Sequence, residues 1–302
     1  SYNLNSLTAE QNALGTANQR LVSNPFYGVI TDATSSLSQA TVQAGQLLRP
    51  YPQYGTITAV NPSIGNSIYH SMQVRVEKRF SRGFTVLGAY TWSKNITDFS
   101  NAAVGSTTGI MDPFNLRLER SLDAQDVPQR LVISGVFELP FGRGRWLGGS
   151  WNRPLDALLG GWQINGIASF QKGEPLVMTA ISGTRPIRLL KSAELSGPVQ
   201  DRLNQYFDTS AFAVPAAFTY GNSSRTAPDL RGPGISNFDL SLFKIFPIHE
   251  RLRAQLRFES FNAMNRVWFG SPGTSIGSTS AGVISSQANS PRQLQLALKM
   301  IF

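Results

Sequence analysis

The C-terminal stretch Arg292-Gln-Leu-Gln-Leu-Ala-Leu-Lys-Met-Ile-Phe302 alternates with a strict two-residue period. One parity is apolar and ends in an aromatic residue: Leu294, Leu296, Leu298, Met300 and Phe302. The other parity is mostly polar. A bilayer-spanning strand needs about 9–11 residues, with its apolar face toward lipid and its polar face toward a lumen. A half-buried edge strand of a soluble sheet alternates in the same way, so this stretch alone leaves both interpretations open.

Six further segments carry strand signals: Ile68–Phe80, Phe84–Lys94, Arg130–Leu139, Gly161–Gln171, Asn237–Phe246 and Arg251–Asn262. Most alternate with period 2, which predicts strands with one apolar and one polar face. We predict that the charged residues of the polar parity face a lumen, namely Arg75, Glu77, Arg79, Arg253, Arg257, Glu259 and Lys299. Glu77 and Glu259 each have arginines on their own face, so we expect structural ion pairs there rather than a catalytic pair of carboxylates.

The connections between these segments alternate in length. Ser81–Gly83 and Pro247–Glu250 are short, and Pro140–Gly160 is intermediate. Asn95–Gln129, Lys172–Ser236 and Ala263–Pro291 are long. In an up-and-down antiparallel sheet this alternation places every long loop at one end, as in outer-membrane barrels. The sequence therefore predicts an all-β, antiparallel, up-and-down transmembrane β-barrel, here a partial barrel or open curved sheet of about 7–9 strands with long extracellular loops.

The direction of the strands follows from this assignment. The last strand should end at the periplasmic side, which leaves the N-terminal part of the chain outside. We expect residues 1–66 to form an extracellular loop region with a short helical turn, capped by Thr8 and Gln11, and Gly55–Val60 to add a short strand. Residues 67–302 should form the C-terminal barrel strands as a single domain, a fragment of a larger barrel.

The composition argues against several other classes of protein. Of the 302 residues, 41% are hydrophobic and 15% are charged, and none is cysteine, which excludes disulfides and thiolate metal sites. The only histidines, His70 and His249, are isolated, so we expect no metal and no cofactor. The net charge is +9, but the basic residues are scattered, which does not favour nucleic-acid binding.

Targeting segments are also lacking in this sequence. No apolar run is long enough for a transmembrane helix. There is no signal peptide and the chain starts at Ser1, so we expect the N-terminus of a longer protein to be missing.

No catalytic motif is present, and we expect no enzyme. The sequence has no Gly-x-Ser-x-Gly nucleophile turn, and Gly142-Arg-Gly-Arg145 lacks the Gly-Lys-Ser/Thr that would open a phosphate-binding helix. We interpret it as a basic periplasmic turn. Loops carry function on rigid scaffolds, so the loops 95–129 and 172–236 are the expected ligand-contacting surface. They offer the charged residues Asp98, Asp112, Arg185, Arg188 and Arg202, although no single ligand-binding residue can be named.

Several motifs resemble those of one family and occur in that family's order. They are Gly65-Asn-Ser-Ile-Tyr-His-Ser-Met-Gln-Val-Arg-Val-Glu-Lys-Arg-Phe80, Tyr90-Thr-Trp-Ser-Lys94, Glu138-Leu-Pro-Phe-Gly-Arg-Gly-Arg145, Gly160-Gly-Trp-Gln-Ile-Asn-Gly166, Phe207-Asp-Thr-Ser-Ala-Phe212, Leu230-Arg-Gly-Pro-Gly234, Phe238-Asp-Leu-Ser-Leu-Phe-Lys244, Arg257-Phe-Glu-Ser-Phe-Asn-Ala-Met-Asn265 and Pro291-Arg-Gln-Leu-Gln-Leu-Ala-Leu-Lys299. From about Gln46 to the end, the chain resembles the barrel of TonB-dependent outer-membrane receptors, most closely their Oar-like branch.

The resemblance implies a transporter in the bacterial outer membrane that takes up a siderophore, an oligosaccharide or a peptide. It implies a plug domain, periplasmic TonB, membrane lipid and the barrel-assembly machinery as partners. It also implies that the terminal alternating residues and Phe302 form the assembly signal. The chain departs from the family pattern, because the family barrel has about 22 strands around a plugged lumen and neither a plug nor a TonB box is evident here. A surface-adhesion protein without transport and a soluble β-sandwich binding module remain the alternatives.

Overall fold

The computed structural model describes residues 2–60, 64–81, 83–99, 110–248 and 252–302. The predicted turn residue Arg82 and the histidine His249 lie outside these ranges. Seven long strands dominate the fold: β5 (Ser67–Ser81), β6 (Phe84–Thr97), β8 (Gln129–Glu138), β9 (Trp162–Gln171), β13 (Ile235–Pro247), β14 (Arg253–Phe261) and β16 (Gln293–Ile301). They correspond one to one with the seven segments predicted from two-residue periodicity.

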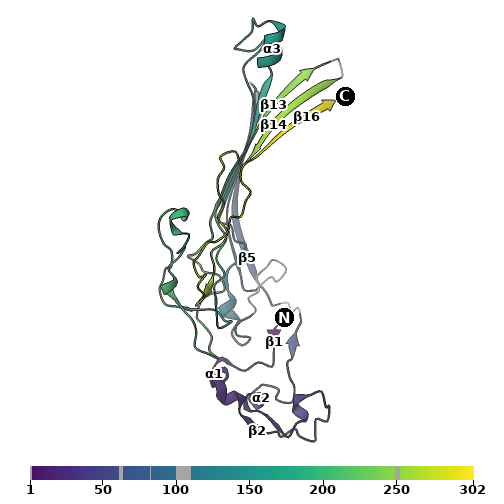
Figure 1. The fold of residues 1–302 in the computed structure, drawn as a ribbon. Coiled ribbons are helices and arrows are strands. Elements are labelled where there is room, and N and C mark those ends of the chain that lie inside the picture. The colour runs from purple at the N-terminus through teal and green to yellow at the C-terminus, as the bar shows by residue number, and fades with distance from the viewer. Residues whose placement is uncertain (1, 61–63, 82, 100–109, 249–251) are drawn as a thin grey trace.

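The long strands form one antiparallel sheet in the order β16-β14-β13-β9-β8-β6-β5. Each long strand is therefore hydrogen-bonded to the long strand before it and after it in the chain, which is the predicted up-and-down order. All three long connections lie at one end of the sheet, and the C-terminus lies at the other (Figure 1). A short strand, β7 (Ser121–Leu122), extends the sheet beside β6. The predicted fold class, a partial barrel or open curved sheet, is confirmed.

One face of the sheet is apolar across all seven strands. The cross-strand register places Val74 opposite Tyr90, Leu242 opposite Ile164, and Leu256 opposite Leu298. Directly opposed residues share a face, so the apolar parities of all strands lie together. Many of these side chains are exposed, among them Ile133, Ile164, Phe258, Leu296 and Leu298. An exposed apolar surface of this extent indicates an apolar environment rather than water.

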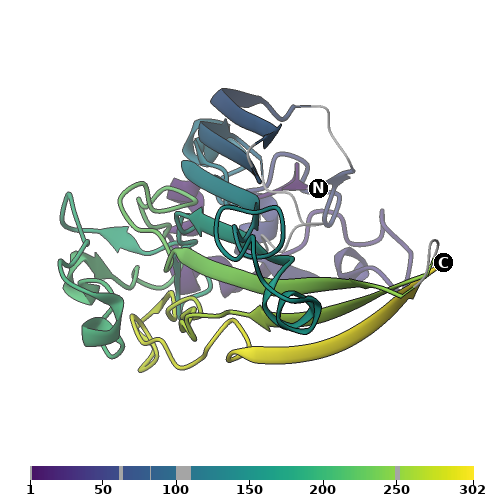
Figure 2. The ribbon, with the colours of Figure 1, turned by 90° about the horizontal axis from the view of Figure 1, so that it is seen from above.

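The other face is polar and concave. A groove of about 340 Å³ runs along it, lined by residues of one parity such as Thr85, Ser134, Asn165 and Ser241. The curvature of the sheet is visible in Figure 2. By register, the charged residues predicted for the lumen share this face: Arg75, Glu77, Arg253, Arg257, Glu259 and Lys299.

The two expected ion pairs on the polar face have different outcomes. Glu77 pairs with Arg75 at 3.0 Å and with Arg79 at 3.7 Å, which also places Arg79 beside it. The expectation for Glu259 is wrong, because it has no ion-pair partner among the described residues. Its neighbour Arg257 instead donates to Gln255 at 3.1 Å and stacks 4.5 Å from the Phe243 ring.

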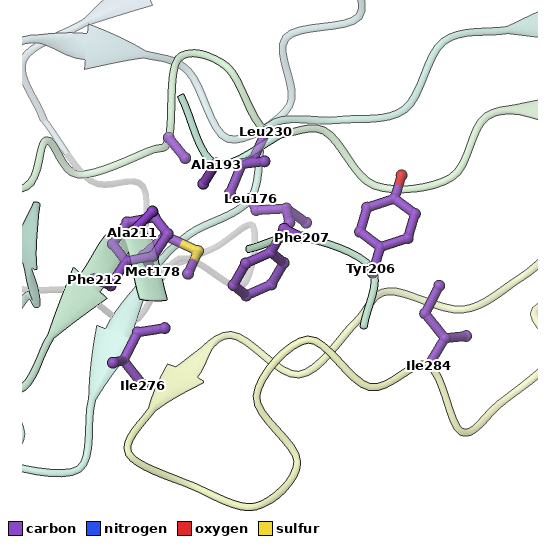
Figure 3. Packing of buried hydrophobic residues seen from close by; sticks show 11 residues of the cluster. Leu176, Met178, Ala193, Tyr206, Phe207, Ala211, Phe212, Leu230, Ile276 and Ile284 are labelled. Carbon is purple, nitrogen blue, oxygen red and sulfur yellow. The ribbon is translucent and has the colours of Figure 1, made fainter. Parts of the chain in front are cut away.

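The hydrophobic core of the molecule lies outside the sheet. No long strand contributes an apolar side chain to the buried set within the described part of the chain. The core consists instead of Leu176, Met178, Ala193, Tyr206, Phe207, Ala211, Phe212, Ala227, Leu230, Ile276 and Ile284, which converge from two long loops (Figure 3). We call the described parts of loops 98–128, 172–234 and 262–292 the loop cap. The sequence did not predict that these loops have a packed core of their own.

Short elements give the loop cap and the N-terminal segment their local order. The cap contains β10 (Thr179–Ala180), β11 (Ile187–Arg188), β12 (Phe212–Ala213), β15 (Ser275–Ile276), η4 (Leu116–Glu119), η5 (Val199–Arg202) and η6 (Thr209–Ala211). The N-terminal segment contains β1 (Tyr2–Asn3), α1 (Ala9–Asn12), η1 (Gly15–Gln19), β2 (Leu21–Ser23), η2 (Ser36–Ser38), β3 (Thr41–Gln43), α2 (Ala44–Leu47) and β4 (Thr58–Ala59).

The N-terminal segment lies at the same end of the sheet as the loop cap (Figure 1). The side-chain amide of Asn12 donates to the backbone carbonyl of Phe218 in the cap at 2.7 Å. The capped helical turn predicted at Thr8 is confirmed, since Thr8 and Gln11 form a reciprocal capping box at the start of α1. The predicted short strand within Gly55–Val60 is β4, which pairs with β1.

The intermediate connection between β8 and β9 contains a helix that the sequence analysis missed, α3 (Arg153–Leu159). The Asn152 side chain caps it by accepting from the Leu155 amide at 2.9 Å. The Asp156 carboxylate of α3 accepts from the Arg143 amide at 2.7 Å. A carboxylate therefore occupies the Gly142–Arg145 turn, which agrees with the interpretation of that motif as a structural turn.

The soluble β-sandwich alternative does not hold. A sandwich buries one face of each of two packed sheets, whereas the described residues form a single large sheet whose apolar face is uncovered. Among the described residues, no helix combines the length and the apolarity needed to cross a membrane.

The opposite surroundings of the two faces can be tested on β13, an inner strand of the sheet. We expect Leu242→Arg, on the apolar face, to lower the free energy of unfolding in lipid vesicles by about 2–4 kcal/mol, the cost of arginine at the lipid-facing midplane of a barrel. The adjacent Ser241→Arg, on the polar face, is the matched control and should cost far less. Equal losses from the two variants would contradict the assignment of the faces.

Candidate functional site

The arginines that the sequence offered as ligand contacts are engaged within the loop cap. Arg185 is almost fully buried and forms an ion pair with the equally buried Glu119. Arg188 pairs with Asp229 at 2.6 Å and lies over the Phe212 ring. These interactions fold the cap, so the two arginines that the sequence offered on the expected ligand-contacting surface are engaged within the cap itself.

The remaining predicted residues are also used structurally. Arg202 donates to the carbonyls of Leu195 and Tyr206 at 2.7 and 2.9 Å. Asp98 accepts from the side-chain amide of Asn66 at 2.9 Å, which ties the two external ends of the β5–β6 hairpin together. Burial acts to raise the pKa of Asp98, but the hydrogen bonds from Asn66 outweigh it and lower that pKa. Asp112 accepts from the Phe114 amide at 2.9 Å and organises a local turn.

Two further arginines join the loops to the strand ends. Arg225, 1% exposed, donates to the backbone carbonyls of Thr97 and Glu119 at 3.1 and 3.3 Å. Arg231 pairs with the buried Asp126 at 2.6 Å and also donates to the carbonyl of Gly173 at 3.2 Å. An arginine fork presents five donors in a fixed plane, which suits it to bridge several carbonyls at once.

These arginines were missed because their partners are remote in sequence. Arg225 and Thr97 are separated by 128 positions. The one available signal was the Leu230-Arg-Gly-Pro-Gly234 motif, in which an arginine precedes two glycines. Burial lowers the pKa of Arg225, while the nearby Glu119 and Asp123 carboxylates act to raise it.

A pocket of about 550 Å³ opens where the cap meets the extracellular ends of β9 and β13, and we call it the rim pocket. It is lined by residues 171–177, 232–235 and 268–272, together with Ala124, Gln125, Thr274 and Ala288. Gln171 lies at the end of β9, directly opposite Arg130 and Ile235 on the polar face. The rim pocket therefore borders the concave face of the sheet.

Glycine is required at the base of the rim pocket. A Cβ on Gly173 would lie 1.8 Å from the carbonyl oxygen of Gly232, and a Cβ on Gly234 would lie 2.7 Å from that of Gln171. Both distances are far below normal contact. The absence of side chains at these two positions lets the start and the end of the 172–234 loop run against each other, and this approach shapes the pocket wall.

The arginines of the loop cap bond to other parts of the protein, whereas the polar side chains of the rim pocket have no such partners among the described residues. Gln125, Gln171, Lys172 and Glu174 line it, and their side chains have no hydrogen-bond or ion-pair partner within the described ranges. The indole N–H of Trp268 is shielded from solvent and likewise has no acceptor there. Pockets that bind small molecules combine apolar walls with a few such polar groups, so the rim pocket is the candidate ligand site.

The described residues contain no group of three or more His, Cys, Asp or Glu side chains that could hold a metal ion. The polar groups of the rim pocket are two amides, one ammonium and one carboxylate. They can donate and accept hydrogen bonds and can hold a ligand in place. Nothing in their arrangement provides a nucleophile beside a base.

An up-and-down sheet with an exposed apolar face, a polar concave face and all long loops at one end defines an integral β-barrel protein of the bacterial outer membrane. The chain belongs to the outer membrane beta barrel domain family, whose sequence model matches residues 2–295. Comparison with curated proteins and with solved structures gives no significant match.

The contribution of the buried ion pair between Glu119 and Arg185 to the stability of the loop cap can be tested by mutation. We expect Arg185→Met to destabilise the cap by about 3–5 kcal/mol, because it leaves the Glu119 carboxylate buried without a counterion. Hydrogen exchange in residues 110–128 measures the loss. The double variant Glu119→Leu/Arg185→Met should restore most of the protection, and Arg143→Met, in an exposed turn, is the control. Loss of protection in the double variant equal to that in Arg185→Met would contradict this account.

The Asp229 carboxylate should make the cap sensitive to acid. Burial acts to raise the pKa of Asp229, but hydrogen bonds from the Ala193 amide and from Arg188 outweigh it, and the pKa is lowered. The stabilisation is therefore complete above the ordinary carboxyl range and is lost as the pH falls through the lowered value. Proteolysis of the 186–230 region should accelerate in that acid range. Asp229→Asn should be cut faster at neutral pH and show a smaller acid effect.

Proposed function

We propose that this chain forms wall and extracellular surface of a TonB-dependent outer-membrane receptor of the Oar-like type. Such a receptor takes up a nutrient ligand, namely a siderophore, an oligosaccharide or a peptide. The observation that carries the proposal is the rim pocket, which lies beside the concave polar face and whose polar side chains have no partner among the residues that the structure describes. The motifs shared with that receptor family support the same function.

In this proposal a ligand is first held outside the membrane by the cap. Gln125, Gln171, Lys172 and Glu174 supply hydrogen bonds, while Trp268 supplies an aromatic surface and a donor. The ligand then moves along the polar face, which offers hydrogen-bonding side chains such as Thr85, Ser134, Asn165 and Ser241. Passage to the periplasm requires a plug domain that rearranges, driven by periplasmic TonB. Neither partner is part of the described residues.

In this mechanism the buried arginines of the loop cap do not bind the ligand but keep the cap ordered. They hold the described parts of loops 98–128 and 172–234 in one arrangement before a ligand arrives. A preformed site loses less conformational entropy on binding than a flexible one. The cap is therefore a receptor surface that is organised in advance, and its specificity resides in the side chains that the fold leaves unpaired.

A second candidate function is surface adhesion without transport. It is favoured by the apolar side chains that the N-terminal segment exposes, among them Leu21, Tyr27, Val29, Tyr51 and Tyr54. An exposed set of this kind suits contact with another macromolecule. In that case the rim pocket is not used for uptake.

The two functions predict different results for a variant of the pocket. We expect Gln171→Ala/Trp268→Ala in the full-length protein to weaken binding of the cognate ligand at least about tenfold, since two to three hydrogen-bonding and aromatic contacts are lost. A panel of ferric siderophores, oligosaccharides and peptides is screened by calorimetry against the purified protein, and uptake by cells is measured with and without a protonophore. Lys191→Gln, on an exposed part of the cap, is the control.

Protonophore-sensitive uptake that the pocket variant abolishes is the expected result. Cell or matrix binding without uptake, unchanged in the pocket variant and reduced by Tyr27→Ser/Val29→Ser, would replace the receptor proposal with adhesion.

A further inference from the structure

A second large cavity lies on the opposite side of the wall, at the extracellular end of the apolar face. Its volume is about 680 Å³, and three consecutive cross-strand pairs of the β5–β6 hairpin line it, with Ser71–Ser93 between two pairs of the apolar parity. Met72 is directly opposite Trp92, and His70 is directly opposite Lys94. Both pairs belong to the apolar parity, so the cavity is on the face that meets lipid and not on the concave face.

The two pairs differ in polarity, because Met72 and Trp92 are apolar whereas His70 and Lys94 are basic. Met72 and Trp92 are 49% and 57% exposed, and the same parity becomes apolar again beyond His70 and Lys94, at the Ile68–Ile96 pair. His70 and Lys94 follow two residues further out, about 7 Å away at the rise of a β-strand. A cationic row therefore lies beside an apolar row near the outer end of the hairpin, where it can meet the headgroup of a lipid whose acyl chain contacts the apolar row.

The loop cap turns this surface into a cavity. Leu122, Pro128 and Pro228 add apolar walls. Leu122 is opposite Ile96 and so shares the apolar face. The aromatic residues of an ordinary interfacial belt lie on the outer surface of a barrel and line no cavity. Here the overhanging cap residues enclose space beside the exposed Met72 and Trp92 side chains.

The charge of the cavity is unbalanced. Its one carboxylate, Asp126, is already bound by Arg231 at 2.6 Å and by the Asn95 amide at 2.6 Å. The Lys94 ammonium has no counterion among the described residues, and the exposed His70 imidazole lies beside it. A cation next to an apolar enclosure, on a face that contacts lipid, complements an acyl chain joined to an anionic headgroup.

We propose that this cavity binds an acylated lipid of the outer leaflet through its phosphorylated headgroup. Lys94 and His70 contact the phosphate, and Trp92 and Met72 pack against the first methylene groups of an acyl chain. The site is independent of the rim pocket and of the proposed uptake function, because the two cavities share no lining residue.

Native mass spectrometry of the full-length protein, purified in a neutral detergent, tests the site. The probes are diphosphoryl lipid A, its dephosphorylated form, phosphatidylcholine and inorganic phosphate. We expect one tightly held diphosphoryl lipid A, and an affinity at least about tenfold weaker in His70→Gln/Lys94→Gln, because charge-assisted hydrogen bonds to the phosphate are lost. Lys94→Arg should retain binding, and Lys191→Gln in the cap is the control.

Trp92→Ala separates the two halves of the site. It should weaken dephosphorylated and diphosphoryl lipid A alike, whereas His70→Gln/Lys94→Gln should weaken only the diphosphoryl form. Heat modifiability on gels verifies that each variant is folded. The proposal is overturned if no lipid is retained, if the double variant binds diphosphoryl lipid A as the unaltered protein does, or if inorganic phosphate displaces the lipid at equal concentration.

Discussion

The pairing of backbone N–H and C=O groups is the constraint on which the rest of this structure depends. Lipid offers these groups no partner, so a strand that crosses a membrane needs a neighbour on both sides. The five inner long strands meet this requirement through the continuous antiparallel ladder. The strands β5 and β16 have a long neighbour on one side only. The sheet is consequently a segment of wall, and its two edges are the places where further strands must pair.

The wall and the loop cap keep their apolar side chains away from water in different ways. The sheet is a single layer without a core of its own, so its apolar side chains contact the surrounding lipid. The cap is surrounded by water and therefore needs a core of its own, which Phe207, Met178 and Leu176 help to form. Hydrogen bonds and an ion pair connect the two parts. Arg225 and Arg231 make these connections, reaching from the 172–234 loop to residues at the outer end of the wall.

Much of the wall could be predicted from sequence because its signals are local. Alternation over about ten residues identifies a strand, and the lengths of the connections give its direction. One residue shows the limit of this reasoning. Lys244 lies on the apolar parity of β13, yet it is buried, with its ammonium donating to the Gly160 carbonyl between the Trp162 and Phe246 rings. Period 2 gives the face of such a residue but not its partners.

The cap could not be predicted in the same way, because its contacts join positions far apart in the chain. Arg185 and Arg188 look like ligand contacts in sequence, since a charged loop residue carries no mark of its partner. Glu119 and Asp229 supply those partners only after folding. Helix α3 was a different kind of omission, because Asn152 followed by Pro154 is a local start signal for a helix.

The separation of paired arginines from unpaired pocket residues has a consequence for how this surface can diversify. Side chains that hold the cap together are buried and have several partners, so exchanging one of them disturbs the whole cap. Gln125, Gln171 and Glu174 have no such duties. Their replacement alters the chemistry presented to the outside while the scaffold stays intact. Under the proposed receptor function, such replacements change which ligand the rim pocket accepts without weakening the cap.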